Sequence, residues 1–318
     1  MFHTEKVSEN YINKDNCPGY YNYVELSDGV NRCVLTDKYV DHYAEEIKNF
    51  EVFDDDIWVI TFPKCGTTWT QEIVWLLNNN LDYEGAYNTL LDVRFPFIEI
   101  GAIVKDPRDS INHCKNLQRP RHIKTHLPKF LLPNQIWTVK PKIIYVARNP
   151  KDAAVSYFHH YRHIIGYTGT KDEFFDAYLA GKLLHSPINE NVLEFWKLRD
   201  EPNILFLYYE DMKRNLKEEI LKMMNFLGKS YTDEQIDKLC DHTSFKSMKI
   251  NPSVNREQRI KTVKTVHNYV SKDENFTFMR EGKIGSHHKE MTEEQKAKFD
   301  KYMAWSEFAN VGFEYKTK

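Results

Sequence analysis

The pattern of hydrophobic and polar positions contains short apolar runs that are each followed by a segment with helical spacing. Three runs rich in β-branched and aromatic residues cover residues 57–62, 142–147 and 204–209. They are apolar throughout, which is typical of parallel strands covered on both faces. The helical segments that follow cover residues 69–78, 153–160 and 216–227. This repeated order of strand, loop and helix predicts an α/β fold with a central parallel sheet flanked by helices.

No internal repeat, low-complexity stretch or linker interrupts this pattern. A length of 318 residues suits one large α/β domain or two modest ones. Because no change of composition marks a boundary, we expect a single domain over residues 1–318. Ligands of parallel sheets bind at the carboxyl ends of the strands, so the loops after the three runs are the first places to look for chemistry.

Charge and composition limit the classes of partner. The chain has 44 Lys and Arg residues and 46 Asp and Glu residues, and its net charge of -2 lacks the basic excess typical of nucleic-acid-binding proteins. Residues 1–15 are polar and charged, unlike a signal peptide, and no apolar run approaches the ~18 residues of a membrane span. We therefore expect neither a nucleic-acid nor a membrane partner.

The cysteines are scattered and odd in number, and they match neither a disulfide framework nor a zinc-binding spacing. They are Cys17, Cys33, Cys65, Cys114 and Cys240. Unpaired thiols fit a reducing compartment, so we expect a cytoplasmic protein without a metal site.

The loop after the first run is suited to an anion. Residues 61–69 read TFPKCGTTW. Gly66 permits a tight turn, and Lys64 adds a positive charge beside it. Thr67 and Thr68 place hydroxyl and amide groups at the start of the next helix, which attracts anions. The alternative is an ordinary turn with a capping threonine, in which Cys65 is a small filler rather than a reactive thiol.

The loop after the second run carries Arg148, and Ser156 follows it within the next helix. A guanidinium at a strand end can bind a phosphate with two hydrogen bonds. Ser156 lies about two helical turns further on, where its hydroxyl could face the same phosphate. The alternative is an Arg–Asp pair on the surface and an incidental serine. Two anion sites at neighbouring strand ends suit a nucleotide with two separate phosphate groups.

These two loops resemble those of the cytosolic sulfotransferases. In that family the first loop resembles TYPKSGTTW, and the segment from Arg148 to Ser156 resembles the motif for a 3′-phosphate. Further matching stretches, in the same order and spacing, are KTHLP at 124–128, YYED at 208–211, HTSF at 242–245 and NPSVN at 251–255. The resemblance extends over about residues 50–300 and implies a P-loop-like nucleotide-binding core.

The resemblance implies 3′-phosphoadenosine 5′-phosphosulfate (PAPS) as the sulfonate donor and adenosine 3′,5′-bisphosphate (PAP) as its product. Trp69 and Phe245 would hold the adenine from both sides, and Arg280 with Gly282 would join the 3′-phosphate site. The full set of implied donor-binding residues is Lys64, Cys65, Gly66, Thr67, Thr68, Trp69, Arg148, Ser156, Tyr209, Thr243, Phe245, Arg280 and Gly282.

The resemblance also implies the catalytic groups and a direct, in-line displacement without a covalent intermediate. His126 would be the general base, because an imidazole can take the proton of a hydroxyl as its oxygen attacks sulfur. Lys64 would stabilise charge on the leaving phosphate, and Lys124 would lie beside the transferring group. Without the resemblance, one histidine among 13 is by default a structural hydrogen-bonding group.

The acceptor is expected to be a small hydroxylated molecule such as a phenol, a steroid or an alcohol. The resemblance implies that residues 1–50 contribute to its pocket, with Phe97, His126 and His160 as contacts. His159 and His160 stand where the family has aromatic residues, which predicts a more polar pocket. In related insect-type enzymes the sulfonated alcohol eliminates, so dehydration is a further outcome.

The C-terminal part departs from the family. Where the family has RKGxxGDWK, residues 280–288 read REGKIGSHH. Glu281 replaces a lysine that would face the 3′-phosphate, so either it turns outward and Lys283 compensates, or donor affinity is lowered. His287 and His288 are expected to be exposed. The family's dimerisation motif is largely absent from residues 288–297, which predicts a monomer or a different dimer.

Two other functions compete with sulfonate transfer. A phosphotransferase on a related core would use a triphosphate and Mg²⁺, but the GxxxxGK[ST] pattern is absent. A weakly catalytic nucleotide-binding or carrier protein is suggested by Glu281 and the altered loop after it. The presence of Lys64, His126 and Arg148 favours an active sulfotransferase.

Overall fold

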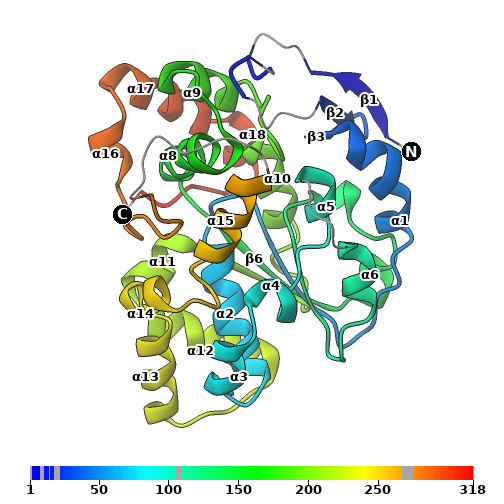
Figure 1. The fold of residues 1–318 in the computed structure, drawn as a ribbon, viewed down its shortest axis with the longest axis vertical. Helices are drawn as coiled ribbons and strands as arrows, with labels where there is room; N and C mark the ends of the chain where they lie inside the picture. The colour runs from blue at the N-terminus through cyan, green and yellow to red at the C-terminus, as the bar shows by residue number, and fades with distance from the viewer. Residues whose placement is uncertain are drawn as a thin grey trace.

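The centre of the protein is a sheet of four parallel strands in the order β5-β4-β6-β7. The computed structural model describes residues 2–7, 11–13, 15–17, 22–104, 109–266 and 276–317. Figure 1 shows the strands running between groups of helices. The strands are β4 (Ile57–Thr61), β5 (His122–Thr125), β6 (Lys142–Ala147) and β7 (Ile204–Tyr208). The predicted α/β fold with a central parallel sheet is confirmed.

Three of these strands coincide with the predicted apolar runs, and β5 was missed. β5 has the sequence HIKT, in which His122 and Lys124 break the apolar pattern. Even so, all four of its residues are buried, because residues 96–98 run along its outer edge. There the backbone N–H of Lys124 donates to Pro96 O over 2.9 Å. A polar strand that is buried by a neighbouring loop has no signature in hydrophobic periodicity.

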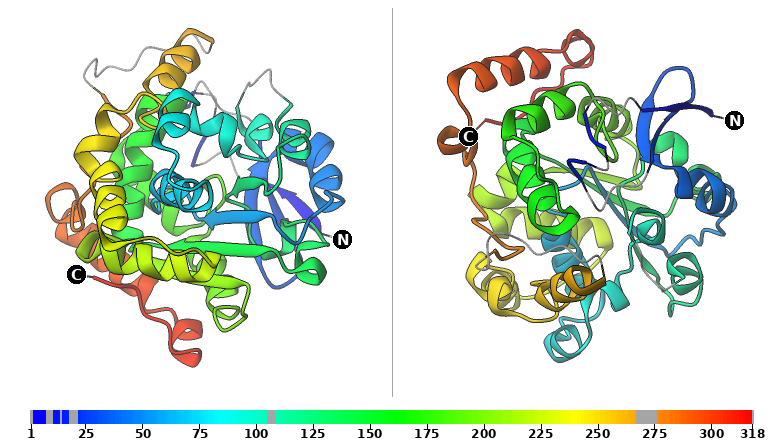
Figure 2. Two further views of the ribbon diagram at one scale, coloured as in Figure 1. Left: turned by 90° about the horizontal axis from the view of Figure 1, so that it is seen from below. Right: turned by 45° about the horizontal axis from the view of Figure 1, so that its top comes forward.

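Helices cover both faces of the sheet, and Figure 2 shows the strands with helices on either side. The predicted helix over 216–227 is confirmed, and the other two begin two or three residues earlier than predicted. The α-helices are α1 (Ala44–Lys48), α2 (Thr67–Asn78), α3 (Tyr83–Asn88), α4 (Leu91–Arg94), α5 (Ile100–Ile103), α6 (Ser110–Lys115), α7 (Ile136–Val139), α8 (Pro150–His160), α9 (Lys171–Leu179), α10 (Ile188–Trp196), α11 (Tyr209–Arg214), α12 (Leu216–Leu227), α13 (Asp233–His242), α14 (Phe245–Ile250), α15 (Glu257–Val266), α16 (His287–Glu290), α17 (Glu293–Met303) and α18 (Ser306–Asn310). Three further helical segments are the π-helical η1 (Tyr39–Tyr43) and η3 (Tyr161–Ile165) and the 3₁₀-helical η2 (Lys129–Leu131).

Alternate side chains of the strands enter two apolar clusters, one on each face. Trp58 and Ile60 pack into the cluster that contains side chains of α8 and α9. Ile57 and Val59 pack into the cluster that contains side chains of α2 and α12. Because both faces are covered, strand residues of either parity must be apolar, which explains the continuous apolar runs.

A second, antiparallel sheet near the N-terminus was not predicted. It consists of β1 (His3–Lys6), β2 (Tyr23–Ser27) and β3 (Arg32–Thr36). Side chains of β2 and β3, such as Leu26 and Val34, belong to the same apolar cluster as α8 and α9. The N-terminal sheet therefore packs on the core that supports the parallel strands. The division of the chain into one domain stays a prediction.

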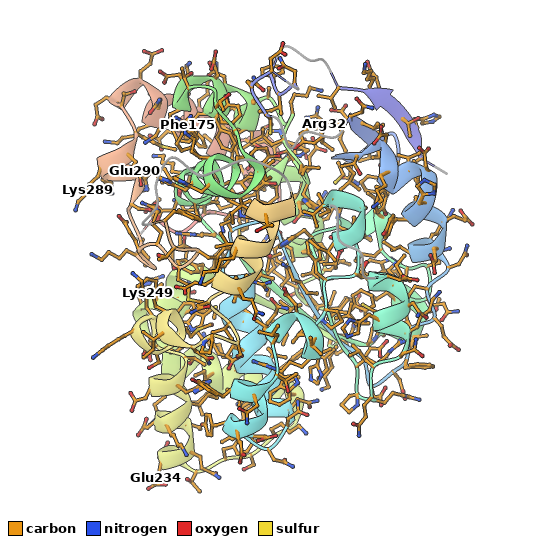
Figure 3. The ribbon with its side chains drawn as sticks, in the orientation of Figure 1. Arg32, Phe175, Glu234, Lys249, Lys289 and Glu290 are labelled. Atoms are coloured by element: carbon orange, nitrogen blue, oxygen red, sulfur yellow. The ribbon has the colours of Figure 1, made fainter. Side chains whose placement is uncertain are left out.

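The outer surface carries the charged side chains. Figure 3 shows Glu234 of α13 and Lys289 of α16 at the periphery, away from the sheet. Across the described ranges, no helix combines the length and apolar character needed to cross a bilayer. All five cysteines are free of disulfides in the structure.

The strand order places a crevice between β4 and β6. The chain passes from β4 to β5 on one side and then returns to β6 on the other side of β4. Loops at such a switch of direction leave the sheet to opposite sides, and the space between them binds ligands. Lys64 follows β4 and Arg148 follows β6, so both predicted anion-binding loops lie at this crevice.

Candidate functional site

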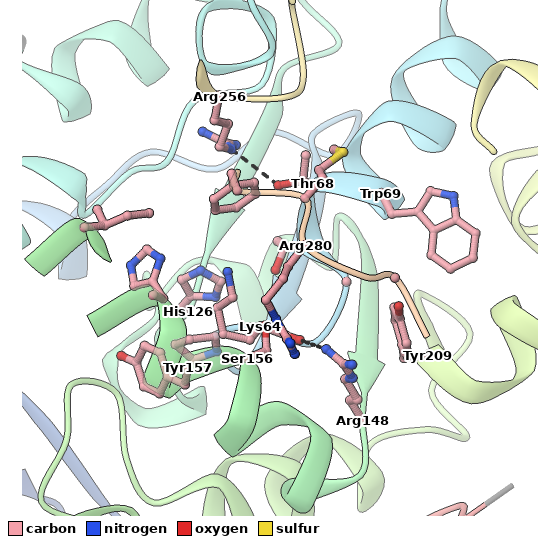
Figure 4. Close-up of a pocket in the computed structure, with 18 of the residues that line it drawn as sticks. Lys64, Thr68, Trp69, His126, Arg148, Ser156, Tyr157, Tyr209, Arg256 and Arg280 are labelled. Carbon is pink, nitrogen blue, oxygen red and sulfur yellow. Dashed lines mark hydrogen bonds between the residues drawn. The ribbon is translucent and has the colours of Figure 1, made fainter. Parts of the chain in front are cut away.

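A cavity of about 310 Å³ lies at the carboxyl ends of the parallel strands. It brings together every site residue predicted from the sequence except Cys65. The predicted residues that line it are Lys64, Gly66, Thr67, Thr68, Trp69, Phe97, Lys124, His126, Arg148, Ser156, His160, Tyr209, Thr243, Phe245, Arg280 and Gly282. Figure 4 shows His126 at one side of Lys64, and Trp69 with Tyr209 at the other.

The loop between β4 and α2 is shaped by two residues with left-handed backbone. Lys64 has φ +70° and Gly66 has φ +96°. A Cβ atom at Gly66 would lie 2.8 Å from Cδ2 of Tyr209, so only glycine lets the loop approach this ring. Gly66 is also the N-cap of α2, so the alternative of a capping threonine is wrong. No described side chain caps this end of α2, which leaves its first amides available to an anion.

Cys65 points away from the cavity. Its thiol is fully buried in the apolar core, and its Sγ lies 3.8 Å from Pro63 O. Burial raises the pKa of this thiol, so it is neither an anion-binding group nor a reactive thiolate. The filler interpretation is supported, and any contact of Cys65 with a donor is restricted to its backbone.

Lys64 lies in a strongly cationic environment. Burial is the largest cause that lowers the pKa of its ammonium to about 7. The positive charges of three arginines act in the same direction; they are Arg148, Arg256 and Arg280. Repulsion among these groups is relieved when an anion binds between them, so the cavity is prepared for negative charge.

Arg148 connects three parts of the site. Its Nη1 donates to Lys64 O over 2.8 Å, and its Nη2 donates to Lys283 O over 3.4 Å. The guanidinium lies 4.2 Å from the centre of the Tyr209 ring. Arg148 is buried, and its Nε has no hydrogen-bond partner among the described residues. A surface Arg–Asp pair is therefore the wrong interpretation, and an N–H group remains for a ligand.

Aromatic rings lie at the end of the cavity away from His126. Trp69 and Tyr209 are in edge contact, with ring centres 5.8 Å apart. Across from them, Gly282 has φ +59°, and a Cβ there would lie 2.2 Å from Cδ2 of Phe245. The glycine backbone thus packs directly on the Phe245 ring. Flat aromatic surfaces at this end suit a planar heterocycle.

His126 has a defined tautomer. Its Nδ1–H donates to Thr61 O over 2.7 Å, and because a carbonyl only accepts, the lone pair of the neutral ring is on Nε2. Burial lowers the pKa of His126 well below its usual value, and the charge of Lys124 adds to this effect. The Lys124 ammonium lies 4.1 Å from the centre of the Phe97 ring. A neutral imidazole with a free lone pair can accept a proton at neutral pH.

The loop before α16 is hydrogen-bonded to Asp152 of α8. The Asp152 carboxylate accepts hydrogen bonds from Gly285 N over 2.7 Å and from His287 Nδ1 over 2.7 Å. His287 is therefore buried, contrary to the expectation that it is exposed, whereas His288 is exposed as expected. In this loop Ser286 and His287 stand where the family has Asp and Trp, and the hydrogen bond between Asp152 and His287 fixes the loop instead.

Arg280 faces carboxylates as well as the cavity. Its Nη1 lies 2.5 Å from Glu290 Oε1 and 3.3 Å from Glu281 Oε1. Glu290 also accepts a hydrogen bond from His159 Nε2 over 2.7 Å. His159 thus contacts α16, and only His160 of the two histidines lines the cavity.

Several cavity residues carry no signal in the sequence pattern. His185 has φ +62°, and its ring centre lies 5.3 Å from that of His126. Neither of its ring nitrogens has a hydrogen-bond partner in the described parts, although Nε2 lies 3.6 Å from Glu99 Oε1. Arg256 enters from the start of α15. Further apolar side chains that line the cavity include Tyr23, Ile100, Ile103, Val104, Tyr157, Ile164, Ile165 and Leu184.

Comparison with known proteins finds similarity to sulfotransferases and to a retinol dehydratase. The profile of the sulfotransferase domain matches residues 54–312. A luciferin sulfotransferase of Photinus pyralis is 42% identical over 276 residues, which cover 82% of this chain and 74% of that protein. Sulfotransferase 1C2 of Rattus norvegicus is 40% identical over 264 residues, which cover 82% of this chain and 86% of that protein. A solved structure of retinol dehydratase with androsterone and the inactive cofactor PAP superimposes with a TM-score of 0.89 at 27% identity and covers 100% of this chain and 99% of that one.

Proposed function

Because the chain belongs to the sulfotransferase family, we propose that its cavity binds PAPS on the side of Trp69 and Arg148 and an apolar hydroxylated acceptor on the side of His126. The chain is a PAPS-dependent enzyme that transfers sulfonate to a small acceptor. The observation that carries the assignment of the site is that one cavity joins both cationic loops to His126.

The residues on the donor side fit a nucleotide with two phosphate groups. The uncapped start of α2 and Lys64 offer donors for the 5′-phosphosulfate. Arg148, with its unpartnered buried Nε, and Ser156 offer donors for the 3′-phosphate. Trp69 and Phe245 provide ring surfaces for the adenine. Gly66 and Gly282 let the backbone pack closely on the rings of Tyr209 and Phe245, which also line the cavity.

His126 supplies the general base in this proposal. Its neutral imidazole accepts the proton of the acceptor hydroxyl at Nε2, while Nδ1–H stays bonded to Thr61 O. When bound, PAPS supplies the sulfonate: the acceptor oxygen bonds to sulfur, the bond from sulfur to the bridging oxygen breaks, and its electron pair stays on the 5′-phosphate. Lys64 and the start of α2 stabilise the charge that grows on this phosphate.

The acceptor side supports an apolar alcohol or phenol. Many aliphatic and aromatic side chains line the cavity that contains His126, and Tyr23 from the N-terminal sheet is one of them. Phe97 lies 4.9 Å from His126 between ring centres, and His160 adds one polar edge. Apolar alcohols such as retinol and androsterone, which are bound in the similar solved structures, are therefore suitable probes.

A transfer assay tests the function directly. Purified enzyme with PAPS is expected to sulfonate members of a panel that contains phenols, retinol and androsterone, without added metal. PAP should bind far more tightly than ATP, which separates sulfonate transfer from the triphosphate-dependent alternative. If PAP binds but no member of the panel is turned over, the weakly catalytic carrier gains support. Dehydration is a second candidate because the chain is similar over its full length to a retinol dehydratase, so the retinol reaction is also analysed for an alkene product.

The low pKa of Lys64, about 7, predicts that PAP affinity falls as the pH rises from 7 to 9. Below pH 7 the ammonium is already charged; above it, binding must first add a proton, which costs up to about tenfold in affinity per pH unit. The phosphates stay fully ionised over this range, since their second pKa is about 6. Titration calorimetry in buffers of different ionisation enthalpy should show proton uptake.

Lys64→Met is the control for this pH dependence. The slope should largely disappear in the variant, and a slope equal to that of the wild type contradicts the assignment. Glu210 is the other group to consider, because burial raises its pKa to about 7 and it lies near Arg148. Any slope left in Lys64→Met is attributed to groups such as Glu210.

Asp152→Asn is expected to weaken PAP affinity roughly tenfold, the effect of losing one hydrogen bond to a charged group. Burial alone would raise the pKa of Asp152, but the hydrogen bond from His287 and the charge of Arg148 hold it at about 2. The carboxylate is thus charged throughout, and its loss frees the loop that carries Arg280. Calorimetry measures the change; Asp200→Asn, on the exposed surface, is the matched control. Equal affinities in both variants contradict the role of this loop.

The remaining expectations are part of the proposal. We infer a cytoplasmic enzyme that acts on small molecules without a nucleic-acid partner, as its charge balance and free thiols favour. A single domain and a monomer, or a dimer of a different kind from the family's, remain predictions. Light scattering after size-exclusion chromatography tests the oligomeric state.

A further inference from the structure

Arg256 contributes a guanidinium to the cavity from the residue that precedes α15. Its Nε donates to the hydroxyl of Thr68 over 3.4 Å, and its Cζ lies 5.7 Å from the centre of the Phe278 ring. Figure 4 shows the side chain directed toward Thr68 at the start of α2. Thr68 belongs to the loop assigned to the 5′-phosphosulfate. Arg256 is thus positioned at the donor's reactive end, away from Arg148.

The conformation of Arg256 is unusual for a residue that only covers a surface. Its φ of +60° is rare for a residue with a Cβ atom and carries a conformational cost. The side chain is 11% exposed and forms an ion pair with Asp92 of α4. Its Nη2 is buried and has no hydrogen-bond partner within the described residues. A buried guanidinium with an unsatisfied N–H group next to a cavity is suited to receive an acceptor from a ligand.

The charge of Arg256 acts on the same centre as Lys64. It is among the cations that lower the pKa of Lys64, which shows that the two groups share one electrostatic environment. The ion pair with Asp92 involves Nη1 of Arg256, and Nη2 has no hydrogen-bond partner among the described residues. An anion beside Thr68 would therefore meet Arg256 and Lys64 together, and it would relieve their mutual repulsion.

We propose that Arg256 is a further cationic residue of the donor site and that it binds the 5′-phosphate beside Thr68 and Lys64. This inference rests on the proposed function. The 5′-phosphate receives the electron pair of the broken bond and remains in the product PAP. Arg256 therefore contributes to donor binding and also to stabilising the leaving group as its charge grows.

The test is calorimetric binding of two ligands that differ only in the 5′-phosphate, PAP and adenosine 3′-monophosphate. Arg256→Met is expected to weaken PAP binding roughly ten- to hundredfold, as for the loss of a charge-assisted hydrogen bond. Binding of adenosine 3′-monophosphate should be equal in the wild type and the variant. Arg256→Lys keeps the charge and should recover part of the loss.

Asp92→Asn is the matched control, because it breaks the same ion pair and leaves the guanidinium in place. We expect the loss of PAP affinity in Arg256→Met to exceed that in Asp92→Asn by at least severalfold. Equal losses in the two variants would mean that Arg256 only ties α15 to α4, and the proposal would be wrong. Equal losses for PAP and adenosine 3′-monophosphate would also overturn it, as would a change confined to the KM of an anionic acceptor.

The failure of this inference is distinguishable from that of the proposed function. A wild-type protein that does not bind PAP contradicts the proposed function itself. A wild type that binds PAP, together with an Arg256→Met variant that binds it equally well, contradicts only the role of Arg256. Thermal melting of each variant identifies unfolded protein, and Arg256→Lys supplies the binding result if Arg256→Met does not fold.

Discussion

Replacing His126 by alanine is expected to lower kcat at least a hundredfold and to leave PAP affinity nearly unchanged. A positioned general base typically contributes 10²- to 10⁴-fold, and no other imidazole in the described cavity has the same tautomer fixed by a carbonyl. The pKa of His126 is well below its usual value, chiefly because of burial, so the wild-type base is already deprotonated at neutral pH. The rate of the wild-type enzyme should therefore not fall between pH 8 and pH 6 through protonation of His126.

Initial rates with saturating PAPS and calorimetry with PAP together test this prediction. The control is His42→Ala, which removes an exposed imidazole of η1 that does not line the cavity. A His126→Ala enzyme that keeps turnover within a few-fold of wild type contradicts the assignment of the base. His185→Ala, added to His126→Ala, then identifies whether the neighbouring imidazole takes the proton instead.

The second large effect is expected at the two cationic loops. Lys64→Met should reduce kcat roughly 10²- to 10³-fold, the effect of losing one group that stabilises developing charge. Arg148→Met should chiefly weaken PAP binding, by roughly tenfold or more, because it removes donors to a phosphate that does not react. We expect Lys64→Met to act mainly on kcat and Arg148→Met mainly on affinity because of where the residues lie. Lys64 is at the end of the cavity near His126, whereas Arg148 lies against Tyr209.

Lys140→Met and Arg119→Met are the matched controls, since both side chains are exposed and distant from the cavity in the fold. Unchanged PAP affinity in both Lys64→Met and Arg148→Met would remove the basis for a donor that spans the two loops. If both variants lose PAP affinity and neither loses kcat, Lys64 contributes to ground-state binding of the donor rather than to stabilisation of the leaving phosphate.

Local patterns were sufficient to predict three of the four central strands, β4, β6 and β7, and the loops that follow them. The runs at β4, β6 and β7 are apolar because both faces of the sheet are covered, and that requirement is visible in consecutive residues. The loop from Lys64 to Thr68 is equally local, since its conformation depends on Gly66 and on the start of α2. The resemblance to a known family then connected these loops to Arg148 and His126.

Other features depend on residues that are far apart in the chain. β5 is buried by residues 96–98, so its polar sequence gave no sign of a strand. His287 is buried because Asp152, 135 residues earlier, accepts its hydrogen bonds. Cys65 is buried in the apolar core, and the neighbouring Gly66 packs on Tyr209, a residue far along the chain. None of these contacts has a periodicity or spacing within the sequence.

Neighbouring residues in the sequence were enough to predict the class of fold and to suggest the two loops as anion sites, and the spacing of the family motifs suggested His126 as the base. Folding was needed to show that these groups share one cavity, that His126 carries its proton on Nδ1, and that Arg256 and His185 line the same cavity. The physical reason is that tautomers, pKa shifts and unpartnered donors arise from burial and from charges brought together by folding.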